Sequence, residues 1–114
     1  MQDSIETGIL IVTTTIGSID AARLLARAIV DAGLAACVQL EPLAASVYHW
    51  QGKVCEEPEV RLTIKTVAQR RAGLQAFLAE HHPYALPQFT AWAASCSPEY
   101  AQWVRDSLES RGPA

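Results

Sequence analysis

The segment KVCEEPEVRLTIKT, residues 53–66, gives the clearest signal for the fold. In its second half, the apolar residues Val60, Leu62 and Ile64 alternate with polar residues. Successive side chains of a β-strand point to opposite faces of a sheet, so this alternation predicts a strand with one buried face. The preceding dipeptide Gln51-Gly52 is typical of a two-residue hairpin turn. The segment is therefore expected to form the second strand of an antiparallel hairpin.

Three further segments complete the predicted sheet. LAACVQL (34–40) and ASVYHW (45–50) are expected to be two pieces of the partner strand, interrupted by Glu41-Pro42. GILIVTTT (8–15) is a short apolar run rich in β-branched residues and predicts a central strand that is buried on both faces. QFTAWAAS (88–95) predicts a fourth strand.

Helices are expected between and after these strands. Ser18 can cap a first helix that ends at Gly33, where a left-handed backbone is easily adopted. Thr66 and Gln69 match a capping box for a second helix, and Pro83 ends that helix. A third helix is predicted to begin at Ser97-Pro98-Glu99 and to bury Tyr100, Trp103, Val104 and Leu108.

The order of the elements is β-α-β-β-α-β with an additional C-terminal helix. This order predicts an α+β, ferredoxin-like antiparallel sheet and a single domain over residues 1–114, with its core at about residues 8–108. The first strand and much of the fourth are apolar on both faces, and monomers rarely expose large apolar patches. The long hairpin would also leave bare strand edges. The pattern therefore predicts an obligate oligomer.

Composition excludes several classes of protein. Of the 114 residues, 50% are hydrophobic and 18% are charged, and the formal net charge of −3 does not suggest a nucleic-acid-binding surface. No apolar run approaches the roughly 20 residues that cross a membrane. The acidic N-terminus lacks the positive region of a signal peptide, so a cytoplasmic location with three reduced cysteines is expected. No nucleophile elbow, P-loop or dinucleotide-binding motif is present, and an enzyme is not expected.

Five segments, in order and at the expected spacing, resemble the CutA family of divalent-cation tolerance proteins. They are LAACV (34–38), SVYHWQGKV (46–54), EEPEV (56–60), IKT (64–66) and HPYALP (82–87). The resemblance runs over nearly the whole chain. It implies a homotrimer, similar to the trimers of the PII signalling proteins, in which long strands of neighbouring subunits pair. It also implies tolerance to divalent metals, copper above all.

The chain departs from the family pattern at four positions. Ala85 and Gln88 stand where the family often has glutamates, and Gln51 and Cys55 replace other usual residues. The loss of carboxylate ligands leaves softer donors, which suit copper better than magnesium or calcium. The resemblance thus indicates His82 and Cys37 as the metal-ligand candidates.

The segment EHHPYALPQF (80–89) raises the question of what its two histidines do. Consecutive helical residues point about 100° apart, so His81 and His82 are not expected to chelate one ion together. His81 is interpreted as a packed histidine at a helix end. His82 is either a hydrogen-bonded hinge or a ligand contact. Cys37 is either a small buried hydrophobe or a copper-binding thiolate.

A second group of residues is expected to form a ligand-binding cleft. Lys65 lies before a helix start, where anions are favoured, and Glu57 or Glu59 is a candidate partner for it across chains. Tyr48, Trp50 and Tyr84 either wall the cleft or form interface core. The predicted function is a homotrimeric copper-tolerance protein that binds metal between subunits. The alternatives are a PII-like signalling trimer with a small anionic ligand at Lys65, or a stable trimeric scaffold for a protein partner.

Overall fold

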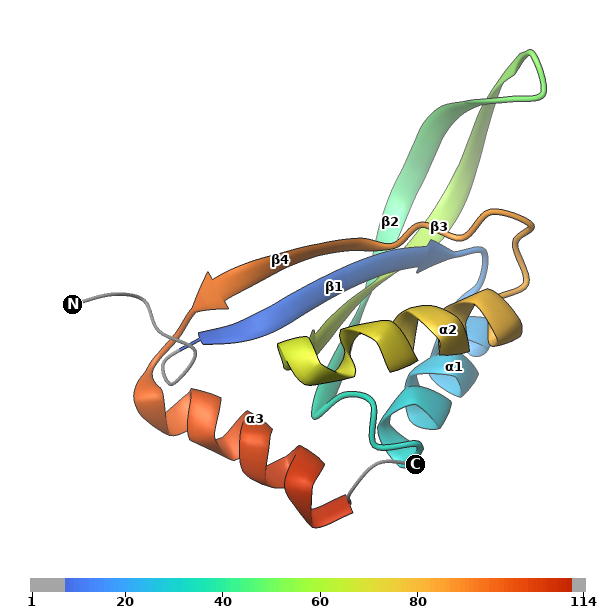
Figure 1. Ribbon diagram of the computed structural model, residues 1–114. Helices are drawn as coiled ribbons and strands as arrows, with labels where there is room; N and C mark the ends of the chain where they lie inside the picture. The colour runs from blue at the N-terminus through green and yellow to red at the C-terminus, as the bar shows by residue number, and fades with distance from the viewer. Residues whose placement is uncertain (1–7, 112–114) are drawn as a thin grey trace.

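The computed structural model describes residues 8–111 (Figure 1). Four strands form one antiparallel sheet in the order β2-β3-β1-β4. This arrangement confirms the predicted ferredoxin-like α+β fold with an additional C-terminal helix. The elements are β1 (Gly8–Ile16), α1 (Ile19–Asp31), β2 (Cys37–Trp50), β3 (Lys53–Thr66), the 3₁₀ turn η1 (Ala68–Arg70), α2 (Arg71–His81), β4 (Thr90–Ser95) and α3 (Pro98–Arg111).

Several local sequence signals are confirmed. The Ser18 side chain accepts a hydrogen bond from the backbone N–H of Ala21 at 3.1 Å, which caps α1. Gly33 follows α1 with φ of 73°, in the left-handed region. Gln51 and Gly52 both have positive φ, of 51° and 79°, as a tight two-residue hairpin turn requires.

The predicted capping box at Thr66 is wrong. Thr66 ends β3 with its side chain fully buried, and its hydroxyl donates to the carbonyl oxygen of Leu34 at 2.7 Å. The Thr66 hydroxyl therefore links β3 to the segment before β2 and does not cap a helix. The turn η1 begins after Val67 without a side-chain cap, and α2 begins only at Arg71.

The strand bounds differ from prediction in three strands, of which β1 only ends one residue later, at Ile16. β2 begins at Cys37 and runs through Pro42 without a break, while β4 begins at Thr90. β2 is an edge strand, the position in a sheet where proline is usually found because alternate N–H groups there have no partner strand. The irregularity lies instead between Leu43 and Ser46, where the β2–β3 register shifts.

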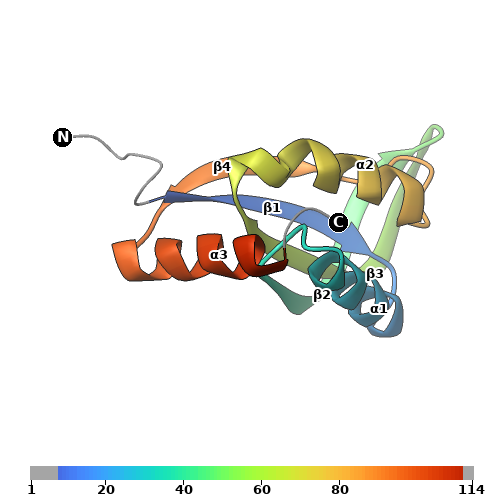
Figure 2. The ribbon, with the colours of Figure 1, turned by 60° about the horizontal axis from the view of Figure 1, so that its bottom comes forward.

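Two apolar layers cover opposite faces of the sheet (Figure 2). Leu10 and Val12 of β1 pack with α1 and α2, whereas Ile9 and Ile11 pack with α3. Because side chains alternate along a strand, α2 and α3 lie on opposite sides of β1. On α3 the buried residues recur every three or four positions, as a helix requires: Ala101, Val104 and Leu108.

The prediction of a broadly apolar second sheet face needs correction. α3 covers its apolar end, and the uncovered remainder is mixed: it carries polar residues such as Thr63 and Gln39, and also Trp92, which is 47% exposed. Trp103, which was expected to be buried, is 48% exposed because it faces away from the sheet. This face is therefore apolar only in part, and it supports the prediction of an oligomer less strongly than a broadly apolar face would.

The β2–β3 hairpin extends well beyond the rest of the sheet (Figure 1). The β1–β3 pairing ends at Val60, so residues 53–59 of β3 pair only with β2. We call the projecting part, residues 43–59, the arm. Val47 and Val54 of the arm are 65% and 67% exposed. Within residues 8–111, none of the helices combines the length and the apolar character needed to cross a membrane.

Candidate functional site

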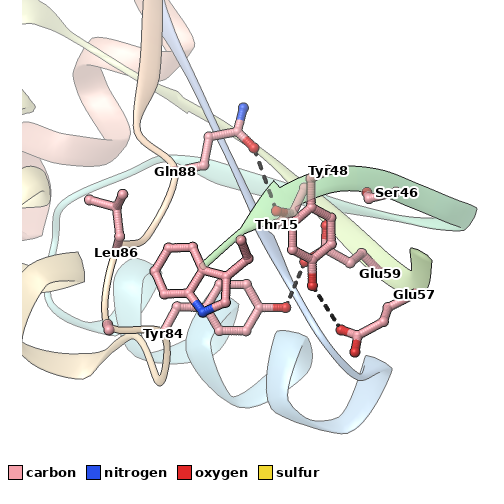
Figure 3. Close-up of a pocket in the computed structure, with 10 residues that line it drawn as sticks. Thr15, Ser46, Tyr48, Glu57, Glu59, Tyr84, Leu86 and Gln88 are labelled. Atoms are coloured by element: carbon pink, nitrogen blue, oxygen red, sulfur yellow. Dashed lines mark hydrogen bonds between the residues drawn. The ribbon is translucent and has the colours of Figure 1, made fainter. Parts of the chain in front are cut away.

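A pocket of about 620 Å³ lies where the arm meets the segment between α2 and β4 (Figure 3). Tyr48, Trp50 and Tyr84 contribute aromatic rings, and Glu57 contributes a carboxylate. These are four of the five residues that the sequence predicted for a ligand-binding cleft. The remaining described residues of the lining are Thr15, Ser46, Glu59, Ala85, Leu86 and Gln88.

The register shift in β2 determines which side chains reach this pocket. Leu43 pairs with Glu59 and Ser46 pairs with Glu57, so β2 advances three residues while β3 advances two. Such a bulge reverses which residues of a strand face which side. As a result Ser46, Tyr48 and Trp50 lie on the same face as Glu57 and Glu59, whereas an unbroken ladder would have presented Val47 there.

The tyrosine hydroxyls hold both carboxylates of the pocket (Figure 3). Tyr48 donates to Glu57 at 3.0 Å and Tyr84 donates to Glu59 at 2.6 Å. The hydrogen bond to Glu57, more than desolvation, raises the pKa of Tyr48. Desolvation, followed by the hydrogen bond to Glu59, raises the pKa of Tyr84 strongly. Both phenols therefore stay neutral at physiological pH, and the negative charge of the pocket resides on the carboxylates.

His82 is a buried structural residue within the subunit, only 6% exposed. Its Nε2 lies 2.8 Å from the carbonyl oxygen of Thr15, and its Nδ1 accepts the N–H of Tyr84 at 3.1 Å. Since the carbonyl can only accept, Nε2 carries the proton. This is the hydrogen-bonded hinge that was one interpretation of His82. With both nitrogens engaged, metal ligation by His82 would require one of these hydrogen bonds to break.

His81 differs from its neighbour. Its side chain is 48% exposed, although its ring centroid lies 4.2 Å from that of Phe77 at the end of α2. His81 therefore packs at the helix end, as expected, but on the surface.

Lys65 lies outside the pocket. It lies eight positions from Glu57 along β3, which corresponds to roughly 26 Å. Its Nζ lies 5.6 Å from the ring centroid of Tyr100, and its cross-strand neighbour is Cys37. A single subunit thus divides the predicted cleft into an acidic aromatic pocket and a separate Lys65–Cys37 region.

The arginines near Lys65 do not form an anion-binding cluster with it. Arg61 pairs with Glu41 at 2.9 Å. Arg70 donates to the carbonyl oxygens of Gly33 and Leu108, which ties the ends of α1 and α3 together. Each of these guanidinium groups therefore has a structural partner.

The two predicted metal ligands are also apart within one subunit. His82 contacts Thr15 of β1. Thr15 pairs with Arg61 of β3, and Arg61 pairs in turn with Glu41 of β2. Cys37 lies four positions from Glu41 along β2, about 13 Å away. Among residues 8–111, no group of three or more histidine, cysteine, aspartate or glutamate residues is positioned to hold a metal ion.

Sequence reasoning missed some residues of the pocket. Glu59 was considered only as an alternative to Glu57 for pairing with Lys65, although the alternation that the two glutamates share could have placed both carboxylates on one face. Ser46 could not have been found, because its orientation depends on the bulge. Leu86 comes from a segment without regular structure, so no periodicity in the sequence indicates where its side chain lies.

Comparison with known proteins gives a consistent answer. Residues 10–107 match the family described as CutA1 divalent ion tolerance protein. The divalent-cation tolerance protein CutA of Thermus thermophilus is 37% identical over 98 residues, which are 85% of this chain and 95% of that protein. Protein CutA of Homo sapiens is 40% identical over 90 residues, 78% of this chain and 50% of the human protein.

The fold leads to the same family. The structure of CutA from Synechococcus elongatus superimposes with a TM-score of 0.82 at 38% identity, covering 90% of this chain and 91% of that one. CutA from Xylella fastidiosa gives a TM-score of 0.83 at 35% identity, with coverage of 88% and 97%. This chain belongs to the CutA family of divalent-cation tolerance proteins.

Proposed function

We propose that the protein is a cytosolic homotrimer that binds divalent copper, or a chemically similar ion, at sites between its subunits. It would act by binding the ion, without catalytic turnover. The family assignment supports a role in tolerance to divalent cations. To this family role the proposal adds three points: that the protein is a trimer, that the ion is copper, and that the binding sites lie between subunits.

The arm is the observation that carries the proposal. It projects from the sheet with β2 as an edge strand, and its apolar side chains Val47 and Val54 lie largely in solvent. Long exposed edge strands tend to pair with another chain, and pairing between copies would cover both the edge and these side chains.

The same geometry supports sites that are shared between subunits. Stable copper or zinc coordination in proteins uses about four ligands. The described residues of one subunit supply no group of three, so a partner copy would have to complete any such site. Cys37, the cross-strand neighbour of Lys65, is the soft donor that we propose as a ligand. We assign His82 a positioning role, because both of its ring nitrogens are engaged.

A small anionic ligand is less well supported. The pocket is lined by two carboxylates, which would repel an anion. Lys65 lies outside it, and Arg61 and Arg70 are bound to other groups. If the protein were a trimer that bound neither copper nor a small anion, the remaining alternative would be a stable scaffold for a protein partner.

Native mass spectrometry of the purified protein, before and after one equivalent of Cu(II) per subunit, tests the proposal. A trimer that takes up three copper ions is expected. Cys37→Ser should reduce this uptake, whereas Cys96→Ser, a thiol that packs beside α3, should not. A monomer would contradict the trimer, and a trimer without stoichiometric copper would contradict the metal role.

A further inference from the structure

The segment between α1 and β2, residues 33–36, leads directly into Cys37 and is fixed by the end of β3. Thr66 donates a hydrogen bond of 2.7 Å to a carbonyl oxygen of this segment. The N–H of Ala36 donates to the carbonyl oxygen of Lys65 at 2.9 Å. Cys37 itself is the cross-strand neighbour of Lys65. The backbone that precedes the thiol is therefore positioned by contacts within the subunit.

Arg70 connects this segment to α3. Its Nε donates to the carbonyl oxygen of Gly33 at 3.1 Å, and its Nη2 donates to that of Leu108 at 3.3 Å. Gly33 follows the last turn of α1, and Leu108 lies in the last turn of α3. Carbonyl groups at the C-terminal end of a helix lack intrahelical partners and carry partial negative charge. One guanidinium group therefore joins two helix ends that both favour a cation.

The other end of α3 also reaches the surroundings of Cys37. Tyr100 lies in the first turn of α3, and its ring centroid is 5.6 Å from Nζ of Lys65, the cross-strand neighbour of Cys37. Tyr100 and Ala36 pack against the same apolar cluster between α3 and the sheet. α3 is thus joined to the surroundings of Cys37 near both of its ends, through Tyr100 at one end and Arg70 at the other.

We propose that Arg70 is a positioning residue for Cys37 and that it couples the binding of a metal ion at Cys37 to the docking of α3. The inference rests on the proposed function, in which Cys37 is a ligand, and the contacts that carry it lie within one subunit. Metal–thiolate bonds are short, about 2.3 Å for zinc, so a small shift of the backbone before Cys37 lowers affinity. Coupling between two parts of a protein is reciprocal, so a metal ion at Cys37 also stabilises docked α3.

Amide hydrogen exchange of the full-length protein, after removal of metals with a chelator, tests the connection without a metal ion. Arg70→Gln should raise the exchange rates by about tenfold both in α3 and at the N–H of Ala36, because it removes both hydrogen bonds of the guanidinium. Arg71→Gln is the matched control, since it removes the same charge from a side chain that lies 5.9 Å from the ring centroid of Phe89. It should change these rates less than about twofold. Faster exchange in α3 alone, with Ala36 unchanged, would overturn the proposal.

A milder variant separates positioning from a general loss of stability. Arg70→Lys keeps the charge but offers one nitrogen in place of two, so it should weaken Cu(II) binding by about threefold to tenfold. Arg71→Lys should change it less than about twofold. At saturating copper, the thiolate-to-copper absorption band of Arg70→Lys should differ from that of the wild type, because the thiol is displaced. A protein that is only less stable would give the wild-type band, and an unchanged affinity and band would overturn the positioning role.

Copper loading of the wild type distinguishes this inference from the proposed function. Bound Cu(II) should slow amide exchange in α3 by about threefold or more, and Cys37→Ser should abolish this effect. Copper uptake that leaves exchange in α3 unchanged would refute the coupling while the proposed function stands. If the wild type bound no copper, the metal role and its coupling to α3 would both be refuted, and the exchange rates of metal-free Arg70→Gln would still decide whether Arg70 positions Cys37.

Discussion

Residues 60–66 and residues 53–59 of β3 pair with the same strand, β2, but have opposite surroundings. In the first stretch Val60, Leu62 and Ile64 are at most 5% exposed. In the second stretch, which belongs to the arm, Val54 is 67% exposed. The difference arises because α1, α2 and β1 adjoin only the first stretch. A strand pattern thus shows which side chains share a face, whereas a further layer decides whether that face is buried.

The largest expected effect concerns the exposed half of this comparison. Val47 and Val54 share the face of the arm opposite the pocket, and the trimer proposal requires that a partner subunit covers them. The double variant Val47→Asp, Val54→Asp should convert the trimer to monomer in sedimentation experiments, because buried unpaired carboxylates are costly.

The fold of each subunit should survive this change. Its far-ultraviolet circular dichroism is expected to match that of the wild type. Leu24→Asp, at an exposed position of α1, is the control and should remain trimeric. If the double variant stayed trimeric while Leu24→Asp became monomeric, the arm would not be what holds the subunits together.

The buried half of the comparison is tested by Leu62→Ala. Leu62 is fully buried between the sheet and the helices, so its truncation should lower the free energy of unfolding by about 2–5 kcal/mol. Urea denaturation at fixed protein concentration measures the change. The exposed Leu24→Ala should stay within about 0.5 kcal/mol of the wild type. If Leu62→Ala and Leu24→Ala lowered the free energy of unfolding by similar amounts, the exposure of a residue in one subunit would not predict the effect of its truncation.

The two adjacent histidines provide a smaller test of the same principle. His82→Leu leaves the Tyr84 N–H and the Thr15 carbonyl without their partner, and we expect a loss of about 1–3 kcal/mol. His81→Leu alters a half-exposed side chain and should cost no more than about 0.5 kcal/mol. Chemical denaturation of the two variants side by side measures this. Equal costs would contradict the structural role of His82.

The smallest expected effect is a pH dependence of the pocket. The folded-state pKa of Tyr84 lies above its ordinary value of 10.0, so the unfolded chain releases this proton first as the pH rises. The stability that Tyr84 contributes is therefore complete below pH 10 and decreases progressively above it. Between pH 10 and 12, the free energy of unfolding should fall more steeply for the wild type than for Tyr84→Phe. Parallel slopes would rule out a raised pKa.

Local chemistry was well predicted where the signal lay within a few residues. The cap at Ser18, the left-handed Gly33 and the Gln51-Gly52 turn all follow from backbone preferences that act locally. The capping box at Thr66 failed because a residue distant in sequence, Leu34, takes its hydroxyl. Hydrogen bonds between distant segments leave no mark in the local pattern.

The candidate site divides in the same way. Glu57 and the aromatic residues near it were recognised from the sequence as candidates for a cleft, but the alternation along β3 was not used to place Glu57 and Glu59 on one face. Lys65 was grouped with them, although roughly 26 Å of the same strand lies between it and Glu57. The order of motifs in a sequence does not show that two residues of one long strand can lie too far apart to share a site.

The sequence by itself determined the order of strands and helices, the hairpin turn and the membership of the family, because periodicity, turn chemistry and motif spacing are properties of neighbouring residues. Only the tertiary structure decided that α3 covers one end of the second sheet face and that the bulge after Leu43 turns Tyr48 toward Glu57. It also decided that His82 is held on both sides within the subunit. These features depend on which distant segments meet, and a single added residue in a strand reverses the faces of all that follow.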